Sequence, residues 1–241
     1  MNVATDLQDR VRSMPEALVP LRERLLSNLV MLSQIPAPTG DEGARVRFVL
    51  DRFNEVGLGD AGTDEVGNAV GRLYGRGGKR TILLVSHLDT IFPASLDHHA
   101  MVQADRVIGP GVSDNALGAA VISMLPAILE HLGVTLDSNL VLLGSTGSMG
   151  RANRSGVRFF LEHPPCPIDF GICVEGIQLG RLNYFSIGAA RADITCDVRS
   201  DTAPAYGSES ALIVLNQIMN RILAISTPSR PYTVIRLGKM R

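Results

Sequence analysis

The feature that most constrains the fold is a regular alternation of apolar runs of strand length with segments of helical length across residues 80–176. The first apolar run, "RTILLVSH", is apolar for most of its length, which is typical of a strand covered on both faces. Strands that alternate with helices of this length predict crossover connections and a mainly parallel sheet with helices on both faces. We therefore predict an α/β core, with helices at 116–131 and 153–162 and further strands at 139–146 and 169–176.

The pattern changes on either side of this core. Before it, the spacing of apolar residues predicts a helix at 19–34. A second helix is predicted to begin after Thr39 or Asp41, which would cap it, and to end at Gly57, followed by a strand at 68–75. After it, residues 181–200 alternate over a longer run, followed by a predicted helix at 208–225 and a strand at 232–238. We therefore predict two domains, an α/β domain at 1–185 and a smaller, partial α+β lid unit at 186–241.

Composition excludes several classes of partner. The chain has 241 residues, 45% of them hydrophobic, which is enough to bury a sizeable core. Its 23 basic and 24 acidic residues leave a net charge of −1 without a long run of like charges, so neither nucleic acid nor a membrane is an expected partner. The N-terminus shows no targeting pattern, and we expect no apolar run of spanning length. Three cysteines without metal-binding spacing fit reduced thiols, so we predict a cytoplasmic protein.

Polar residues of catalytic type follow the predicted strands. His87 and Asp89 come after the first core strand, Asp114 precedes a helix, and Glu175 follows the last strand of the core. Singly, each has an ordinary interpretation, as a hydrogen-bonded strand end, a helix cap or a turn acid. Because the carboxyl ends of parallel strands meet at one edge of the sheet, we expect these residues to converge. One imidazole and two carboxylates suit a zinc-like metal, with Asp89 holding the ring of His87.

Several motifs resemble the zinc aminoacylase and carboxypeptidase family, which includes acetylornithine deacetylase, succinyl-diaminopimelate desuccinylase and glutamate carboxypeptidase-like metallopeptidases. They are "IPAPTGDE", "SHLDTIFP", "GPGVSDNALGAA" and "CVEGIQLGRLNYFSIGAARADITC". The resemblance implies a zinc-exopeptidase-like catalytic domain with two zinc ions and a glutamate as general base. It assigns His87 and Glu175 as ligands of one zinc, Asp114 as the bridging ligand and Asp89 as the residue behind His87, and it implies a cis peptide between Asp114 and Asn115.

The glycine-rich stretch after the strand at 139–146 departs from that family. Where the family carries two adjacent glutamates, the general base and a ligand of the second zinc, this sequence has Ser148 and Met149. A serine hydroxyl is no proton acceptor near neutral pH without its own base, and a thioether is a poor zinc ligand. The family's lid-domain histidine and its last histidine ligand also have no counterpart in the sequence. The resemblance therefore implies a degenerate, C-terminally truncated member that holds one zinc ion or none.

We therefore expect a deacylase-like or peptidase-like scaffold with weak or no hydrolysis, whose ligand is a small molecule with an amide or carboxylate. The alternative is an active single-metal amidohydrolase or peptidase on N-acyl amino acids or dipeptides, with a base from elsewhere. The adjacent His98 and His99 are weighed as further metal ligands, but neighbouring side chains diverge in direction, which argues against that role. A third class, nucleotide binding by the glycine-rich loop at 145–156, lacks an acid well placed to bind a ribose. We also expect a homodimer through the lid unit, because the strand predicted near 232–237 leaves an uncovered edge.

Overall fold

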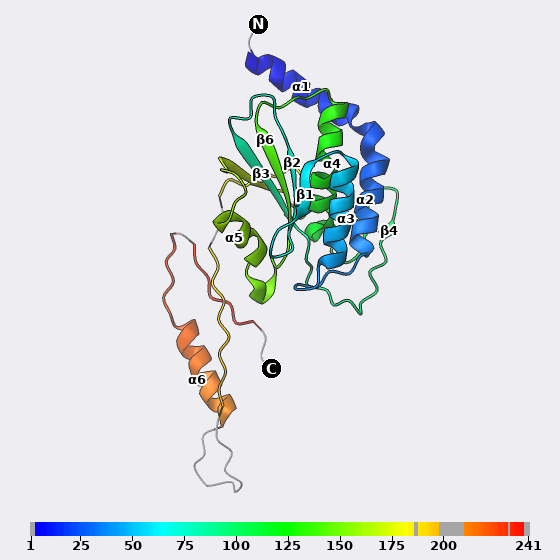
Figure 1. The fold of residues 1–241 in the computed structure, drawn as a ribbon. Coiled ribbons are helices and arrows are strands. Elements are labelled where there is room, and N and C mark those ends of the chain that lie inside the picture. The colour runs from blue at the N-terminus through cyan, green and yellow to red at the C-terminus, as the bar shows by residue number, and fades with distance from the viewer. Residues whose placement is uncertain (1–2, 186–187, 198–209, 231, 239–241) are drawn as a thin grey trace. The chain divides into compact units, whose positions relative to one another are not determined.

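The computed structural model describes residues 3–185, 188–197, 210–230 and 232–238 and forms two compact units, Met1–Arg181 and Leu182–Arg241 (Figure 1). In the first unit the helices are α1 (Val3–Ala17), α2 (Arg22–Gln34), α3 (Gly43–Glu55), α4 (Leu117–His131) and α5 (Ser155–Glu162). Short helical turns lie at Val19–Leu21 (η1), Val112–Ala116 (η2) and Gly150–Ala152 (η3). The strands are β1 (Gly59–Thr63), β2 (Ala69–Leu73), β3 (Thr81–His87), β4 (Met101–Val102), β5 (Val107–Ile108), β6 (Asn139–Ser145) and β7 (Phe170–Cys173).

Five of these strands form one mixed sheet in the order β1-β2-β6-β3-β7, and β4 and β5 form a separate hairpin. Strand β3 pairs in parallel with both β6 and β7, whereas β2 pairs antiparallel with β1 and with β6. Only β2 therefore runs against the other four strands of the sheet. The prediction of an α/β fold with a mainly parallel sheet is confirmed.

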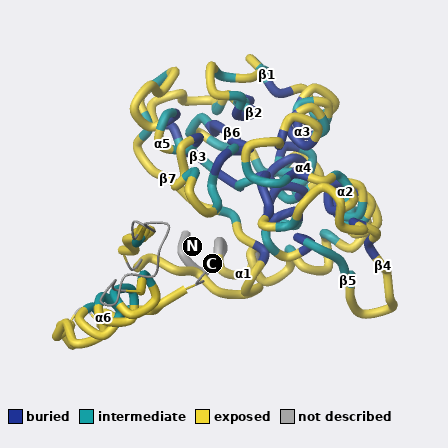
Figure 2. Tube along the Cα trace, turned by 90° about the horizontal axis from the view of Figure 1, so that it is seen from below, coloured by how far each residue is buried: buried dark blue, intermediate teal, exposed yellow. Residues whose placement is uncertain are grey.

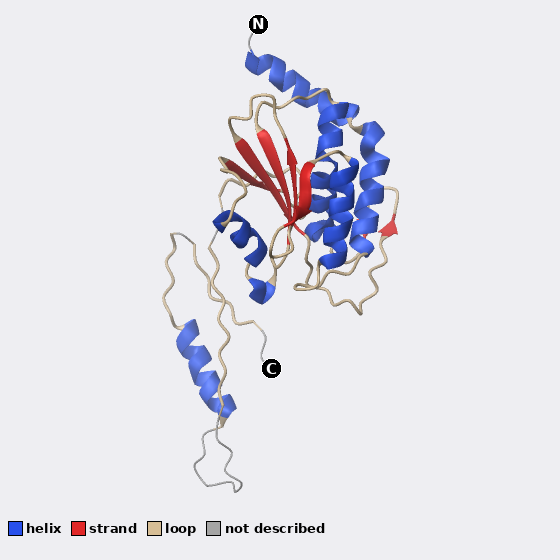
Figure 3. Ribbon diagram, viewed as in Figure 1, coloured by secondary structure: helices blue, strands red, loops and turns tan. Residues whose placement is uncertain are grey.

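Helices cover both faces of the sheet, which forms the central layer (Figure 3). Residues of α2, α3 and α4 form one apolar cluster with the sheet, while Phe160 of α5 packs on the other face against Leu83, Val85, Val141 and Leu143. Nearly every residue of β6 is buried, and Figure 2 shows buried residues gathered along β6 and α4. The apolar content of β3 and β6 thus has the expected cause, burial on two faces.

Helix α4 corrects one expectation from the sequence. The stretch Val112–His131 is long and apolar enough to cross a membrane by length and composition alone, although no apolar run of spanning length was expected. Half of its apolar window is buried inside the protein, where the helix packs on the sheet. A core helix surrounded by other apolar elements has few polar positions, because little of its surface meets water.

The second unit contains α6 (Ala211–Leu223), inside the helix predicted at 208–225, of which residues 208–209 lie outside the described part. The described residues at 181–185, 188–197 and 232–238 contain no strand, so the alternating run forms none there and the strand predicted at 232–238 is not found. The remainder of the alternating run, 186–187 and 198–200, lies outside the described residues. Alternation makes a segment able to pair, but a strand also needs a partner for its backbone groups, and none is described in this unit.

Candidate metal centre

The four residues singled out in the sequence meet at the carboxyl end of β3 and β7. His87 is the last residue of β3, Glu175 lies just beyond β7, and Asp114 lies in η2, immediately before α4. The Nε2 atom of His87 is 3.0 Å from Asp114 Oδ1 and 3.6 Å from Glu175 Oε2. One potential ligand atom from each of the three residues lies within 4.8 Å of the others, so the group has the geometry of a metal site.

The ring of His87 is surrounded by acceptors on both sides. Its Nδ1 atom is 3.1 Å from the backbone oxygen of Asp89 and 3.3 Å from Asp89 Oδ1. Neither oxygen can donate, so both contacts call for a hydrogen on Nδ1, and a ring with its single hydrogen there would face two carboxylates with the lone pair of Nε2. That arrangement requires either a second proton or a cation between Nε2 and the carboxylates.

The pKa values of these groups reflect the same crowding. Burial acts to lower the pKa of His87, but the hydrogen bond to Asp89 and the negative charges of Glu175, Asp89 and Asp114 outweigh it, so the pKa is raised above 6.5. The pKa of Glu175 is raised by burial and by the charge of Asp114, against the opposing effect of His87. A divalent cation would relieve the repulsion between the two carboxylates and take the place of the proton on His87.

Asn115 ties the three elements of the site together. Its side-chain nitrogen donates to Ser86 Oγ and to the Val174 carbonyl, both at 2.8 Å. Its side-chain oxygen accepts from the backbone nitrogens of Gly118 and Gly176, both at 3.1 Å. The peptide bond between Asp114 and Asn115 is cis, as the resemblance implied. The fully buried amide therefore fixes η2, and with it Asp114, against the ends of β3 and β7.

Asp89 is fully buried behind His87 and joins it to the glycine-rich loop. Its Oδ2 atom accepts from Thr39 Oγ1 at 2.8 Å and from the backbone nitrogens of Ser148 at 3.0 Å and Met149 at 2.7 Å. Burial acts to raise the pKa of Asp89, but the hydrogen bonds from His87, Met149 and Thr39 and the charge of His87 lower it below 3.8. Thr39, expected as a helix cap, instead orients this carboxylate.

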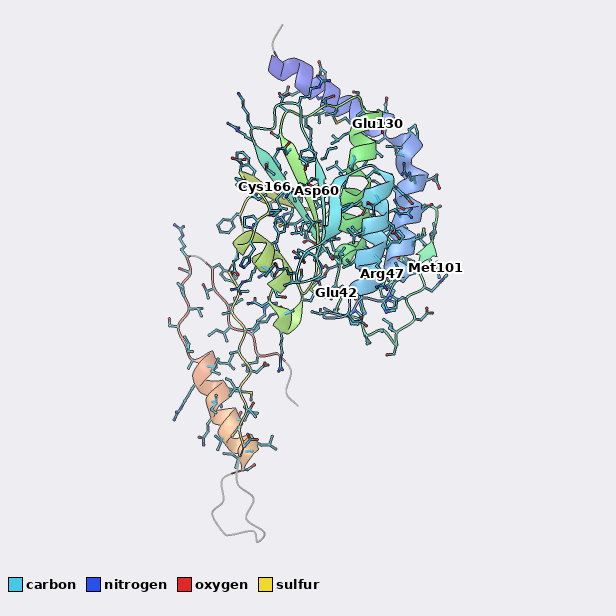
Figure 4. The ribbon with its side chains drawn as sticks, in the orientation of Figure 1. Glu42, Arg47, Asp60, Met101, Glu130 and Cys166 are labelled. Atoms are coloured by element: carbon cyan, nitrogen blue, oxygen red, sulfur yellow. The ribbon has the colours of Figure 1, made fainter. Side chains whose placement is uncertain are left out.

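Glu42 holds the same loop from another side, and sequence reasoning missed it. Its Oε1 atom accepts from the backbone nitrogens of Gly40 and Gly147, both at 2.9 Å. Figure 4 labels Glu42 at the start of α3, near the end of the sheet where the loop begins. Three consecutive loop amides, 147–149, thus donate to two carboxylates from elsewhere in the chain, which removes them as donors to a phosphate. This arrangement weakens the nucleotide-binding interpretation.

Arg45 is a second buried charged residue that the sequence did not indicate. It is 1% exposed, and it donates from Nε to the Ile35 carbonyl at 2.9 Å and from Nη1 to the Leu88 carbonyl at 3.0 Å. Burial lowers the pKa of Arg45 to about 10, with the charge of Asp89 opposing the shift. Its bond to Leu88 fixes the backbone between His87 and Asp89, which makes it a positioning residue.

The other residues considered in the sequence, Ser148 and the spare histidines, have other partners in the described structure. Ser148 Oγ is 3.3 Å from Ser145 Oγ, so its close partner is another hydroxyl. Among the described residues, the one group of potential metal ligands is His87, Asp114 and Glu175, so neither His98 nor His99 joins it. The Nε2 atom of buried His98 lies 3.1 Å from the Pro93 carbonyl. The structure therefore brings together the three predicted ligands and gives the spare histidines no place among them.

Comparison with known proteins gives two kinds of sequence match. Residues 68–147 match peptidase family M28. Carboxypeptidase G2 from Pseudomonas sp. (strain RS-16) is 31% identical over 252 aligned residues, covering 97% of this chain and 60% of the relative. A putative [LysW]-lysine/[LysW]-ornithine hydrolase from Thermococcus kodakarensis is 41% identical over 69 residues, 29% of this chain and 19% of the relative. The chain thus spans less than two thirds of the length of these relatives.

Solved structures share the fold. A tripeptidase from Staphylococcus aureus matches with a TM-score of 0.52 and 20% identity over 64% of this chain and 43% of that one. A dipeptidase from Saccharomyces cerevisiae matches with a TM-score of 0.55 and 16% identity, over 68% and 40% of the two chains. Human carnosine dipeptidase 1 gives 0.54 and 11%, over 70% and 42%. In sequence the chain is similar to aminoacylase- and carboxypeptidase-like metallopeptidases, and it shares its fold with these solved peptidases.

Proposed function

We propose that the chain binds one zinc ion through His87, Asp114 and Glu175 and presents it to a small molecule with an amide or carboxylate group, with weak or no hydrolysis. The observation that carries the proposal is the pair of carboxylates facing Nε2 of His87, at 3.0 and 3.6 Å. One imidazole nitrogen and two carboxylate oxygens are a donor set that suits zinc. The Asp114 and Glu175 side chains are 41% and 44% exposed, so the site has an open side for a ligand.

Two residues next to the potential ligands, Asp89 and Asn115, have definite roles in this proposal. Asp89 and the adjacent backbone keep the hydrogen on Nδ1 of His87, which leaves Nε2 free as a ligand. The hydrogen bonds of the Asn115 side chain hold the adjacent Asp114 so that its carboxylate faces Nε2 of His87. A bound zinc ion would polarise a carbonyl oxygen or lower the pKa of a bound water.

The loop residues explain why we propose weak hydrolysis. Ser148 and Met149 supply no proton acceptor, and the two carboxylates that hold the loop, Glu42 and Asp89, already accept hydrogen bonds from its amides. General acid–base catalysis typically contributes about 10²–10⁴-fold to a rate. The alternative, an active single-metal amidohydrolase, requires a base that none of these side chains provides in the described structure.

We further propose a small-molecule partner and a homodimer formed through the unit at 186–241, in a cytoplasmic protein. Support for the dimer comes from α6, on which Leu212, Ile213 and Leu223 are each more than half exposed. Large contiguous apolar patches on a surface commonly mark interaction sites, and we propose that these residues contribute to one.

The test is a zinc titration by calorimetry, combined with assays on N-acyl amino acids and dipeptides. We expect one ion per chain, loss of that binding in His87→Ala, and no change in the control His99→Ala, which removes an exposed histidine outside the group. Two tightly bound ions in the wild-type chain, or unchanged binding in His87→Ala, would contradict the single-ion site. Turnover comparable with that of an efficient peptidase would support the alternative.

A further inference from the structure

A small pocket lies between β1, β2 and the C-terminal end of α5, and it is separate from the candidate metal centre. Strands β6 and β3 separate β2 from β7 in the sheet, and none of His87, Asp114 and Glu175 lines the pocket. Its volume is about 220 Å³, below the roughly 300–1,000 Å³ of pockets for drug-sized ligands, so it suits a smaller molecule. Its wall combines charged and apolar residues, among them Asp60, Val70, Arg72, Phe160, His163 and Pro165.

Gly62 of β1 keeps this pocket open. It pairs with Val70 of β2, and directly opposite residues of an antiparallel pair have their side chains on the same face of the sheet. Val70 packs against the apolar cluster that contains Phe160, so a side chain at position 62 would face α5. A Cβ atom at Gly62 would meet no atom within 4 Å. The glycine therefore leaves space that a ligand can fill.

Two opposite charges in the pocket have hydrogen-bonding capacity left. Nη1 of Arg72 lies 3.6 Å from Oδ2 of Asp60, and the same oxygen accepts a hydrogen bond from the Tyr74 hydroxyl at 2.7 Å. Both contacts use Oδ2, so Oδ1 of Asp60 has no partner among the described residues, and neither has Nη2 of Arg72. The Asp60 and Arg72 side chains are 61% and 23% exposed. The pair can therefore offer an acceptor and a donor to one ligand.

The other polar groups argue against a metal ion or a simple anion. Asp64 also lines the pocket, but its Oδ1 accepts from the backbone nitrogens of Val66 and Asn68, and its Oδ2 accepts from the side chain of Asn68. The described residues contain one group of potential metal ligands, which lies at the candidate metal centre. Two carboxylates beside one guanidinium leave no excess of positive charge for an anion.

We propose that this pocket binds a free α-amino acid with a branched apolar side chain. The ligand's carboxylate contacts the guanidinium of Arg72, and its ammonium contacts Oδ1 of Asp60. Its side chain lies against the apolar part of the wall, Val70, Phe160 and Pro165. A zwitterion fits the pair of opposite charges better than either ion alone, because each of its charged groups meets a partner of opposite sign. The inference does not depend on the proposed function, because the pocket includes no potential metal ligand.

The experiment is calorimetry on the full chain with L-leucine and three molecules that each lack one of its groups. Isocaproate lacks the ammonium, isoamylamine lacks the carboxylate, and glycine lacks the side chain. We expect L-leucine to bind and each of the other three to bind about tenfold more weakly or less. A chelator is present throughout, because a free amino acid also binds zinc directly.

Three variants assign the binding to the pocket. Gly62→Leu fills the space and should abolish binding of L-leucine. Asp60→Asn should weaken binding of L-leucine and isoamylamine but not of isocaproate, because it removes the partner of the ammonium. Asparagine also tolerates the left-handed backbone at this position, where φ is 51°. Arg72→Gln should have the opposite selectivity, weakening L-leucine and isocaproate but not isoamylamine.

The matched controls lie outside the pocket. Gly171→Leu also adds a side chain to a strand glycine whose Cβ would meet no atom within 4 Å, but in β7. Arg80→Gln removes the charge of an exposed arginine just before β3. Both variants should bind L-leucine as the wild type does.

Several outcomes would overturn the site. They are absence of L-leucine binding, equal affinity for L-leucine and its two singly charged analogues, and unchanged binding in Gly62→Leu. If Gly62→Leu does not fold, the opposite selectivities of Asp60→Asn and Arg72→Gln decide, and their absence overturns the proposal.

Discussion

Replacement of Asp89 by asparagine separates two roles of this residue, the support of the loop and the orientation of His87. The carboxylate is fully buried, accepts three hydrogen bonds through Oδ2 and lies 3.3 Å from Nδ1 of His87 through Oδ1. Asparagine has the same shape, and its oxygen can still accept from the amides of Ser148 and Met149. Its amide nitrogen would then face the hydrogen on Nδ1 of His87, with two donors opposed.

The magnitudes follow from these contacts. Charge-assisted hydrogen bonds are about twice as strong as neutral ones, so loss of the charge weakens three of them, but it also removes the cost of burying a carboxylate. We expect Asp89→Asn to lower the free energy of unfolding by about 1–2 kcal/mol. Asp89→Ala leaves buried donors without an acceptor and should cost about 3–5 kcal/mol. Opposed donors favour the tautomer with the hydrogen on Nε2, so zinc affinity in Asp89→Asn should fall about 10–100-fold.

Urea unfolding measures the first quantity, and zinc calorimetry on the folded variant measures the second. The control is Thr39→Val, which removes one donor to Oδ2 and should cost about 1 kcal/mol without changing zinc affinity. The backbone oxygen of Asp89 also lies 3.1 Å from Nδ1. If zinc affinity in Asp89→Asn stays within about twofold of the wild type, that oxygen alone fixes the tautomer, and the orienting role of the side chain is refuted.

Three further predictions follow from the site. Zinc affinity should rise as the pH is raised through the pKa of His87 in the folded protein, which lies above 6.5, because zinc must displace the proton on the ring. Without metal, the contribution of this raised pKa to the free energy of unfolding is fully present below pH 6.5 and is lost as the pH rises through the folded pKa. Titrations on either side of that range check the sign, and a flat profile would contradict it. Gly118→Ala should lower the free energy of unfolding, measured by urea denaturation, by about 1–3 kcal/mol, because the added Cβ would overlap the Val174 carbonyl. The control is Gly43→Ala in α3, whose Cβ would make only an ordinary contact with an arginine side chain, so this variant should not be destabilised. The pair Ser148→Glu and Met149→Glu should strengthen metal binding in calorimetry but leave amide hydrolysis weak, and substantial turnover with zinc would show that the site needs no further ligand.

The regular part of the fold was predictable because its causes are local. Strands β3 and β6 are apolar since they are buried on two faces, and parallel strands bring His87 and Glu175 to one edge. Strand β1, Gly59–Thr63, was missed because it is made mostly of small and polar residues and owes its structure to pairing with β2. The absence of a described pairing partner likewise explains why residues 188–197 and 232–238, whose sequences alternate, form no strand in the described structure.

The supports of the site could not be read from the sequence, because they depend on contacts between distant residues. Glu42 bonds to Gly147, 105 positions away, and Arg45 to Leu88, 43 positions away. A charged residue near the start of an amphipathic helix is normally assigned to the solvent face. Nothing in the local pattern distinguishes a buried glutamate or arginine from an exposed one.

The attachment of residues 147–149 to Glu42 and Asp89 has a consequence for how this protein can change over time. The path of the loop is set by backbone amides and by carboxylates that lie outside it, so the side chains at 148 and 149 contribute little to holding its shape. Substitution at these two positions can therefore exchange one chemistry for another without refolding the surroundings. A lineage could gain or lose reactive groups here at small structural cost, and a randomised library at both positions would be a practical starting point for engineering new activities on this scaffold.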